Sequence, residues 1–258
     1  MSFKNPFKAH HGPKKSAISR TVEREFERET KKAEELDENV KKIYKNMKRC
    51  TEFQAAQSKC EVKLTQNLLT GPLCREDDEL RHSAEQWSAA VKRLEASSEE
   101  LNSTAQKTVI EPMKKLASVF PSLQQSMRRR DQSLQEFNRC QSKVEKYSER
   151  ERTGPNMVKL ESSKRSRLSA KEDFEAQNET LMEDMAAFYD ARVDFFSPSF
   201  QALIKSQIKY YTDAHQSYEG LQHVFSQSKD AGESDEEFLQ KTQQKLAEIR
   251  ALSVTLDD

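Results

Sequence analysis

The apolar residues of this chain recur at alternating intervals of three and four, and this spacing limits the possible folds more than any other feature. In the first third of the chain the pattern comprises Ala33, Leu36, Val40, Ile43, Met47 and Cys50. A longer run begins at Leu80 and continues to Thr108, and a further run extends from Leu116 to Val144. Residues at these spacings form a narrow apolar seam along one side of a helix, which is buried against another helix. We therefore expect long helices that pack lengthwise.

Glycine and proline divide this pattern into three helical segments. Gly71–Pro72 ends the first segment and Thr153–Pro155 separates the second from the third, which restarts near residue 156. The second segment contains Pro112. It lies in the step from Thr108 to Leu116, which is eight residues and so one longer than a heptad. This predicts one helix of about 70 residues, bent near Pro112. Pro198 is expected to interrupt the third helix in the same way.

Three long helices joined by short turns predict an all-α fold, an elongated antiparallel three-helix coiled coil. Only 34% of the 258 residues are apolar, which is little for a compact globule, so we expect a second copy of the chain to cover the remaining seam. The predicted organisation is a basic flexible arm (1–20), a helical domain (21–225) and an acidic linker with a short C-terminal helix (226–258). The residues expected in the bundle or dimer seam are Leu36, Val40, Ile43, Met47, Trp87, Val91, Leu94, Leu203 and Tyr210.

The charges balance overall, 43 basic against 43 acidic, but they are unevenly distributed. Residues 139–171 contain ten bases and four acids, whereas residues 230–258 contain three bases and eight acids. The bases near Gly154 repeat at i, i+3, i+7 on both flanking helices, which suits anionic lipid headgroups. A solvated helix face with ion pairs is the alternative. A secondary basic patch comprises Arg128, Arg129 and Arg130, of which Arg130 falls on the seam and indicates either a buried pair or a drift in the heptad.

Several functional classes are disfavoured. No stretch of the sequence approaches the roughly 18 apolar residues that a transmembrane helix requires. The N-terminus also lacks the apolar core of a secretory signal. The four cysteines, Cys50, Cys60, Cys74 and Cys140, are scattered, which favours reduced thiols in a cytoplasmic protein. No histidine lies at a metal-ligand spacing, and no glycine-rich phosphate loop or nucleophile motif is present. We therefore expect no enzyme, no cofactor or metal, and no nucleic-acid partner.

Six sequence blocks, in order, resemble the amphiphysin/Rvs branch of BAR-domain proteins, and most closely its short members without a Src-homology-3 domain. The blocks are residues 21–29 (TVEREFERE), 107–112 (KTVIEP), 119–123 (VFPSL), 143–147 (KVEKY), 153–155 (TGP) and 188–200 (FYDARVDFFSPSF). The resemblance implies a crescent-shaped antiparallel dimer whose concave face and tips bind curved anionic membrane. The bends at Pro112 and Pro198 would then give the crescent its curvature.

The resemblance also implies site residues and partners. The candidate membrane contacts are Lys143, Lys146, Arg150, Arg152, Lys159, Lys164, Arg165 and Arg167. The expected roles are endocytosis and actin organisation linked to Rho-family GTPases, as a cytoplasmic protein that is peripheral on membranes and associated with the cytoskeleton. The alternative is a helical cytoskeletal adaptor that binds actin or Rho-family GTPase regulators without remodelling membranes. Pro6, Gly12 and Pro13 interrupt the N-terminal stretch where some relatives insert an amphipathic helix, so scaffolding is favoured over wedging by this arm.

Overall fold

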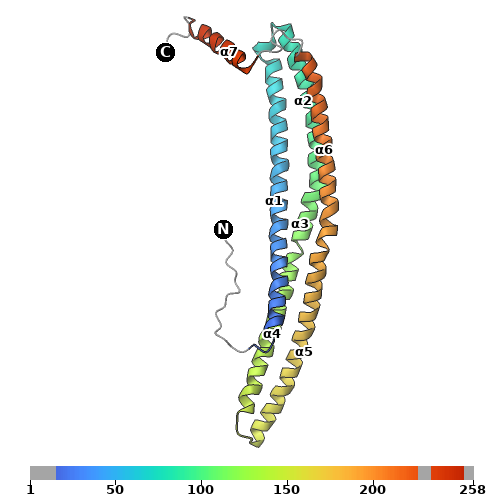
Figure 1. Ribbon diagram of the computed structural model, residues 1–258, viewed down its shortest axis with the longest axis vertical. Helices are drawn as coiled ribbons and strands as arrows, with labels where there is room; N and C mark the ends of the chain where they lie inside the picture. Colours follow the sequence, from blue (N-terminus) through green and yellow to red (C-terminus); the bar gives the residue numbers. More distant parts are fainter. Residues whose placement is uncertain (1–15, 226–233, 253–258) are drawn as a thin grey trace. The chain divides into compact units, whose positions relative to one another are not determined.

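The computed structural model describes residues 16–225 and 234–252, and these residues are helical apart from short turns (Figure 1). The elements are α1 (Arg20–Thr70), a 3-10 turn (Pro72–Cys74), α2 (Asp78–Ala105), a π-helical turn (Gln106–Ile110), α3 (Glu111–Ala117), α4 (Phe120–Ser148), α5 (Gly154–Asp190), α6 (Arg192–Phe225) and α7 (Asp235–Arg250). The described residues contain no strand, as the spacing of apolar residues predicted. No helix in this part of the chain is long and apolar enough to cross a bilayer.

The chain divides into two compact units. The first comprises the described parts of Met1–Lys48 and Gln106–Gln201. In it, the beginning of α1 packs with α4 and α5 around two apolar clusters. Phe137 and Phe174 stack with ring centroids 6.2 Å apart in one cluster, and Phe26 packs with Leu181 and Met185 in the other.

The second unit comprises the described parts of Arg49–Ala105 and Ala202–Asp258. Here the end of α1, α2 and most of α6 form the helical body. Gln54 Nε2 donates to Tyr210 Oη at 2.8 Å, and Ser97 Oγ donates to Asp213 Oδ2 at 2.8 Å, which joins α6 to both other helices. The predicted short C-terminal helix is α7, in which every residue is exposed.

The predicted second helix of about 70 residues is interrupted twice. The π-helical turn at 106–110 ends two residues before Pro112 and accommodates the one residue by which the apolar spacing exceeds a heptad. A proline cannot donate to the carbonyl one turn earlier and its ring crowds that carbonyl, so a wider turn relieves the conflict. The second interruption is Ser118–Val119, after which Pro121 occupies the first turn of α4, where a missing N–H costs nothing.

The third helix breaks at a different place from the one we predicted. It is interrupted at Ala191, between α5 and α6, and Pro198 lies inside α6. The expectation that Pro198 interrupts the helix is therefore wrong. One proline removes a single backbone hydrogen bond, and the bonds of the flanking turns are enough to carry the helix past it.

The predicted seam is buried to different degrees within one chain. Leu36, Val40, Val91 and Leu94 are buried. Ile43, Met47, Trp87, Leu203 and Tyr210 are only partly buried. The predicted flexible arm extended to residue 20, but Ala17 and Ile18 pack on the Phe137–Phe174 cluster, and Ala17 N donates to Asn138 Oδ1 at 2.7 Å. Residues 1–15 of this arm, which include Pro6, Gly12 and Pro13, lie outside the described residues.

Candidate functional site

The turn between α4 and α5 closes one end of a helical hairpin (Figure 1). Residues 149–153, which we call the tip turn, are held by local hydrogen bonds. Thr153 N donates to Glu151 O at 2.8 Å, and Asn156 Nδ2 donates to the same carbonyl at 2.9 Å. Gly154 and Pro155 then start α5, with proline in the first turn, where it is favoured. The hairpin end is therefore a compact turn with a defined conformation.

The basic residues predicted as membrane contacts surround this turn, and the structure exposes most of them. Seven are exposed, and we call them the tip bases: Lys143, Lys146, Arg150, Arg152, Lys159, Lys164 and Arg165. Only Arg165 forms an ion pair with another described residue, a 4.0 Å contact with Glu161. An exposed pair at this distance contributes little. The tip bases are therefore available to an external anionic surface.

Arg167, the eighth predicted contact, is held differently. Its side chain is partly buried, its Nη1 donates to Gln141 Oε1 at 3.3 Å, and its Nε is buried. This contact joins α5 to α4 within the hairpin. Arg167 is thus less accessible to a membrane than the tip bases, and a role in joining the two helices suits it better.

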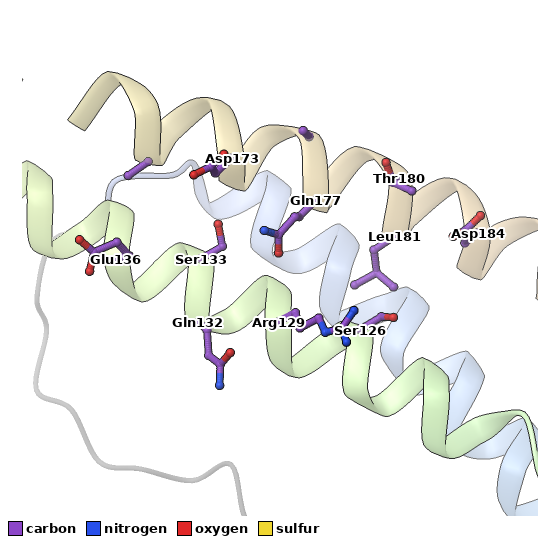
Figure 2. Close-up of a pocket in the computed structure, with 12 residues that line it drawn as sticks. Ser126, Arg129, Gln132, Ser133, Glu136, Asp173, Gln177, Thr180, Leu181 and Asp184 are labelled. Atoms are coloured by element: carbon purple, nitrogen blue, oxygen red, sulfur yellow. The ribbon is translucent and has the colours of Figure 1, made fainter. Parts of the chain in front are cut away.

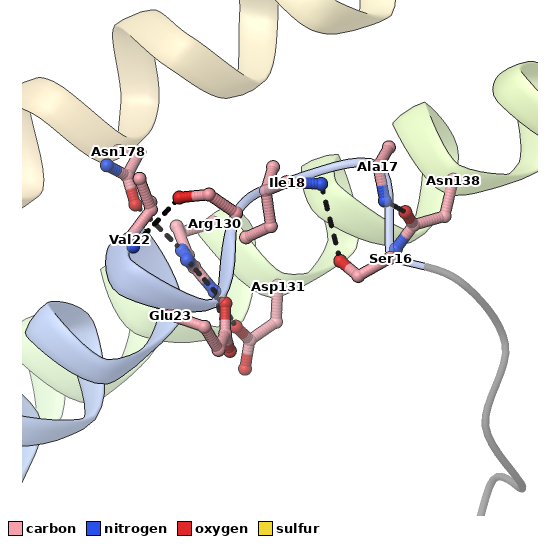
Figure 3. A network of polar contacts seen from close by, with 10 residues as sticks. Ser16, Ala17, Ile18, Val22, Glu23, Arg130, Asp131, Asn138 and Asn178 are labelled. Carbon is pink, nitrogen blue, oxygen red and sulfur yellow. Dashed lines mark hydrogen bonds and ion pairs between the residues drawn. The ribbon is translucent and has the colours of Figure 1, made fainter.

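The predicted secondary basic patch is wrong in one residue. Arg128 and Arg129 are exposed, but the side chain of Arg130 is fully buried. Its guanidinium donates to Glu23 at 3.0 Å, to Asp131 at 3.2 Å and to Asn178 at 3.0 Å (Figure 3). The sequence left open whether Arg130 forms a buried pair or marks a drift in the heptad, and the structure shows the buried pair.

Aromatic rings complete the surroundings of Arg130. Its guanidinium carbon lies 3.9 Å from the ring centroid of Phe26 and 5.1 Å from that of Phe174. Burial raises the pKa of the Asp131 carboxyl above its usual range, and the hydrogen bond from Arg130 opposes this shift. The network ties the first turn of α1 to α4 and α5, so its role is structural rather than membrane-facing.

A groove runs between α4 and α5 on the side away from α1 (Figure 2). Nine of its twelve lining residues are polar or charged, among them Arg129, Glu136, Asp173 and Asp184. Small-molecule sites are usually enclosed and have only a few placed polar groups, whereas this groove is open to solvent and has charged side chains along it. Among the described residues, no cluster of three or more histidine, cysteine or acidic side chains could hold a metal ion.

Two apolar residues at the tip were not identified from the sequence. Met157 and Val158 lie near the beginning of α5 and are 46% and 70% exposed. The signal that could have revealed them is a pair of large apolar residues directly after a turn and next to Lys159.

The comparisons with known proteins agree with this architecture. The family model described as "BAR domain" matches residues 12–227. The chain is 44% identical over 253 residues to Bridging integrator 3 of Mus musculus, covering 98% of each chain. It is 22% identical over 170 residues to "Regulator of cytoskeleton and endocytosis RVS161" of Candida albicans, covering 66% of this chain and 64% of that one. The amphiphysin BAR domain from Drosophila has a TM-score of 0.66 at 15% identity, covering 84% of this chain and 96% of that one, which shows the shared fold alone.

Proposed function

The chain belongs to the BAR-domain family, and from this premise we propose that it is a non-catalytic scaffold that dimerises and binds anionic membranes through its tip bases. Members of the family dimerise, bind membranes and act in membrane curvature and endocytosis, as scaffolds rather than enzymes. The proposal for this chain adds peripheral binding on the cytoplasmic side, and sensing or generation of curvature by the dimer.

The observation that carries the membrane proposal is the exposure of the tip bases. They lie at the end of α4, at the beginning of α5 and in the turn that joins these helices, and six of the seven form no ion pair with a described residue. A basic residue close to an anionic surface contributes about 1 kcal/mol, and this contribution falls within a Debye length of about 8 Å at physiological salt. Several such residues at each end of a dimer would bind with added avidity.

Dimerisation is supported by apolar side chains that the second unit leaves exposed. On α6, Ile204, Ile208, Tyr211 and Tyr218 follow heptad-like steps and are 53%, 62%, 65% and 45% exposed. Phe53 and Leu64 are similarly exposed on α1. Apolar stripes of this kind favour contact with a further helix, and a second copy of the chain supplies one. We expect a dimer at micromolar concentration by light scattering and a monomer for Ile208→Glu with Tyr211→Glu. A wild-type monomer would contradict this part of the proposal.

Sedimentation with liposomes of graded anionic content and diameter tests the membrane proposal. The test variant is Lys164→Glu with Arg165→Glu on α5, and the matched control is Lys92→Glu with Arg93→Glu on α2. Both are adjacent exposed pairs, so the total change in charge is the same. Because two bases contribute about 1 kcal/mol each, the tip variant is expected to bind at least about 30-fold more weakly. Binding that ignores anionic lipid and curvature, with equal behaviour of the two variants, would refute the proposal.

A cytoskeletal adaptor is the second candidate. It is supported by the name of the Candida albicans relative, a regulator of cytoskeleton and endocytosis. In that case the tip bases would bind an acidic protein surface such as actin or a regulator of Rho-family GTPases. Co-sedimentation with actin filaments in the absence of lipid, lost in the tip variant and retained in the control, would favour the adaptor.

A further inference from the structure

The end of the α4–α5 hairpin presents two large apolar side chains to solvent. Val158 is 70% exposed and Met157 is 46% exposed, although both belong to a regular helix. Leu160, two residues further on, is already partly buried. Met157 N donates to Thr153 O at 3.0 Å, so the first turn of α5 is formed, and the pair is held at the hairpin end.

The charge at the extreme tip does not match that of the region behind it. Residues 149–161 contain three bases and three acids: Arg150, Arg152 and Lys159 against Glu149, Glu151 and Glu161. Residues 139–171 as a whole contain ten bases and four acids, so the excess of positive charge lies behind the tip, on α4 and α5. Electrostatic attraction alone would therefore not draw the outermost residues to an anionic surface.

We infer that Met157 and Val158 insert into the interfacial region of an anionic bilayer while the bases behind them contact the lipid headgroups. The inference rests on the proposed membrane function and deepens it. Lys164 follows Val158 by six residues, which is about 9 Å along a helix. Apolar faces of interfacial helices lie about 5–10 Å deep at the boundary between headgroups and acyl chains. With the tip inserted to that depth, Lys164 lies at the level of the phosphates.

The same helix offers a matched control. Leu168 is 53% exposed, an exposure between those of Met157 and Val158. It follows Val158 by ten residues, about 15 Å further from the tip. An inserted tip would therefore leave Leu168 above the apolar region of the bilayer.

Depth-dependent quenching tests the insertion directly. The full chain carrying Val158→Trp is mixed with phosphatidylcholine vesicles that contain phosphatidylserine and acyl chains brominated at known depths. Trp87, the single tryptophan of the chain, gives the background emission in the wild-type protein. We expect acyl-chain bromine to quench the V158W emission and to leave the emission of a Leu168→Trp variant at the background level. Equal quenching of both variants, or of neither, on vesicles that bind the protein would overturn the inference.

Binding measurements complete the test. Met157→Ser with Val158→Ser removes apolar surface without changing charge, and Leu168→Ser is the control. We expect the double variant to bind the same vesicles about tenfold more weakly, while its dependence on salt is retained, and Leu168→Ser to bind like wild type.

If the wild-type protein binds and the double variant binds equally well, the inference fails and the proposed function stands. If the wild-type protein ignores anionic vesicles, both fail. Loss of the dimer in the double variant would mean that the tip contacts a second copy, and would also overturn the inference.

Discussion

The buried guanidinium of Arg130 allows a quantitative prediction, because the charge itself and one of its acidic partners, Glu23, can be removed separately. The first perturbation is Glu23→Gln, which removes one charge partner and leaves the guanidinium fully buried. Removal of the only partner of a buried charge costs about 3–5 kcal/mol. Here Asp131 remains bonded at 3.2 Å, and the Glu23 side chain is 39% exposed, which screens its interaction. We therefore expect a loss of about 2 kcal/mol in the free energy of unfolding.

The second perturbation is Arg130→Met, which removes the charge and retains an apolar chain between Phe26 and Phe174. Replacement of a buried ion by a hydrophobic residue of similar volume is often close to neutral, and the two carboxylates left behind are both more than a third exposed. We expect a cost of about 1 kcal/mol. In this background Glu23→Gln should cost almost nothing, so the coupling between the two residues is about 2 kcal/mol.

The assay is urea unfolding followed by far-ultraviolet circular dichroism, at one fixed protein concentration because dimerisation would add to stability. Glu27→Gln, one turn further along α1 and exposed, is the matched control and should change stability by less than about 0.5 kcal/mol. Hydrogen exchange should show faster opening of the first turns of α1 in the Glu23 variant. A coupling below about 0.5 kcal/mol would refute the reasoning, because it would mean that the buried charge does not depend on Glu23.

The remaining predictions concern a titrating group and two glycines. The hydrogen bond and charge of Lys32 hold the pKa of the Glu29 carboxyl below its usual value, so the stability that it provides is present above the unfolded-state pKa and is lost as the pH falls through the folded-state pKa. Glu29→Gln should cost about 1 kcal/mol at neutral pH and reduce the loss of stability on acidification, measured by urea unfolding between neutral pH and pH 3. An unchanged acid profile would count against this role. A Cβ at Gly71 would lie 2.7 Å from the backbone oxygen of Asn67, whereas a Cβ at Gly220, inside α6, would meet nothing within 4 Å. Gly71→Ala should therefore destabilise by about 1 kcal/mol or more and Gly220→Ala should stabilise by about 0.5–1 kcal/mol, and thermal denaturation that ranks the two variants in the opposite order would contradict this explanation.

Local sequence signals determined the long helices and the two turns between them, but not the break at Ala191. The apolar spacing predicted long helices. These helices are separated at Gly71 and at the Thr153–Pro155 turn, where glycine and proline occur in the sequence. These signals act between residues that are close in the chain, so one sequence suffices to interpret them. The concentration of bases around the tip was equally visible, because a local excess of charge requires only counting.

Tertiary packing decided how individual side chains are used. Arg130 follows two other arginines and looks in the sequence like part of a surface patch. It is buried because its guanidinium binds Glu23, 107 residues away, and Asn178, 48 residues away. Arg167 belongs to the same basic row as the tip bases, yet it bonds to Gln141 on the neighbouring helix. Met157 and Val158 look like core residues in the sequence and are exposed because the hairpin ends there. Periodicity specifies that a face is covered, but burial of one residue depends on partners that only the folded chain brings together.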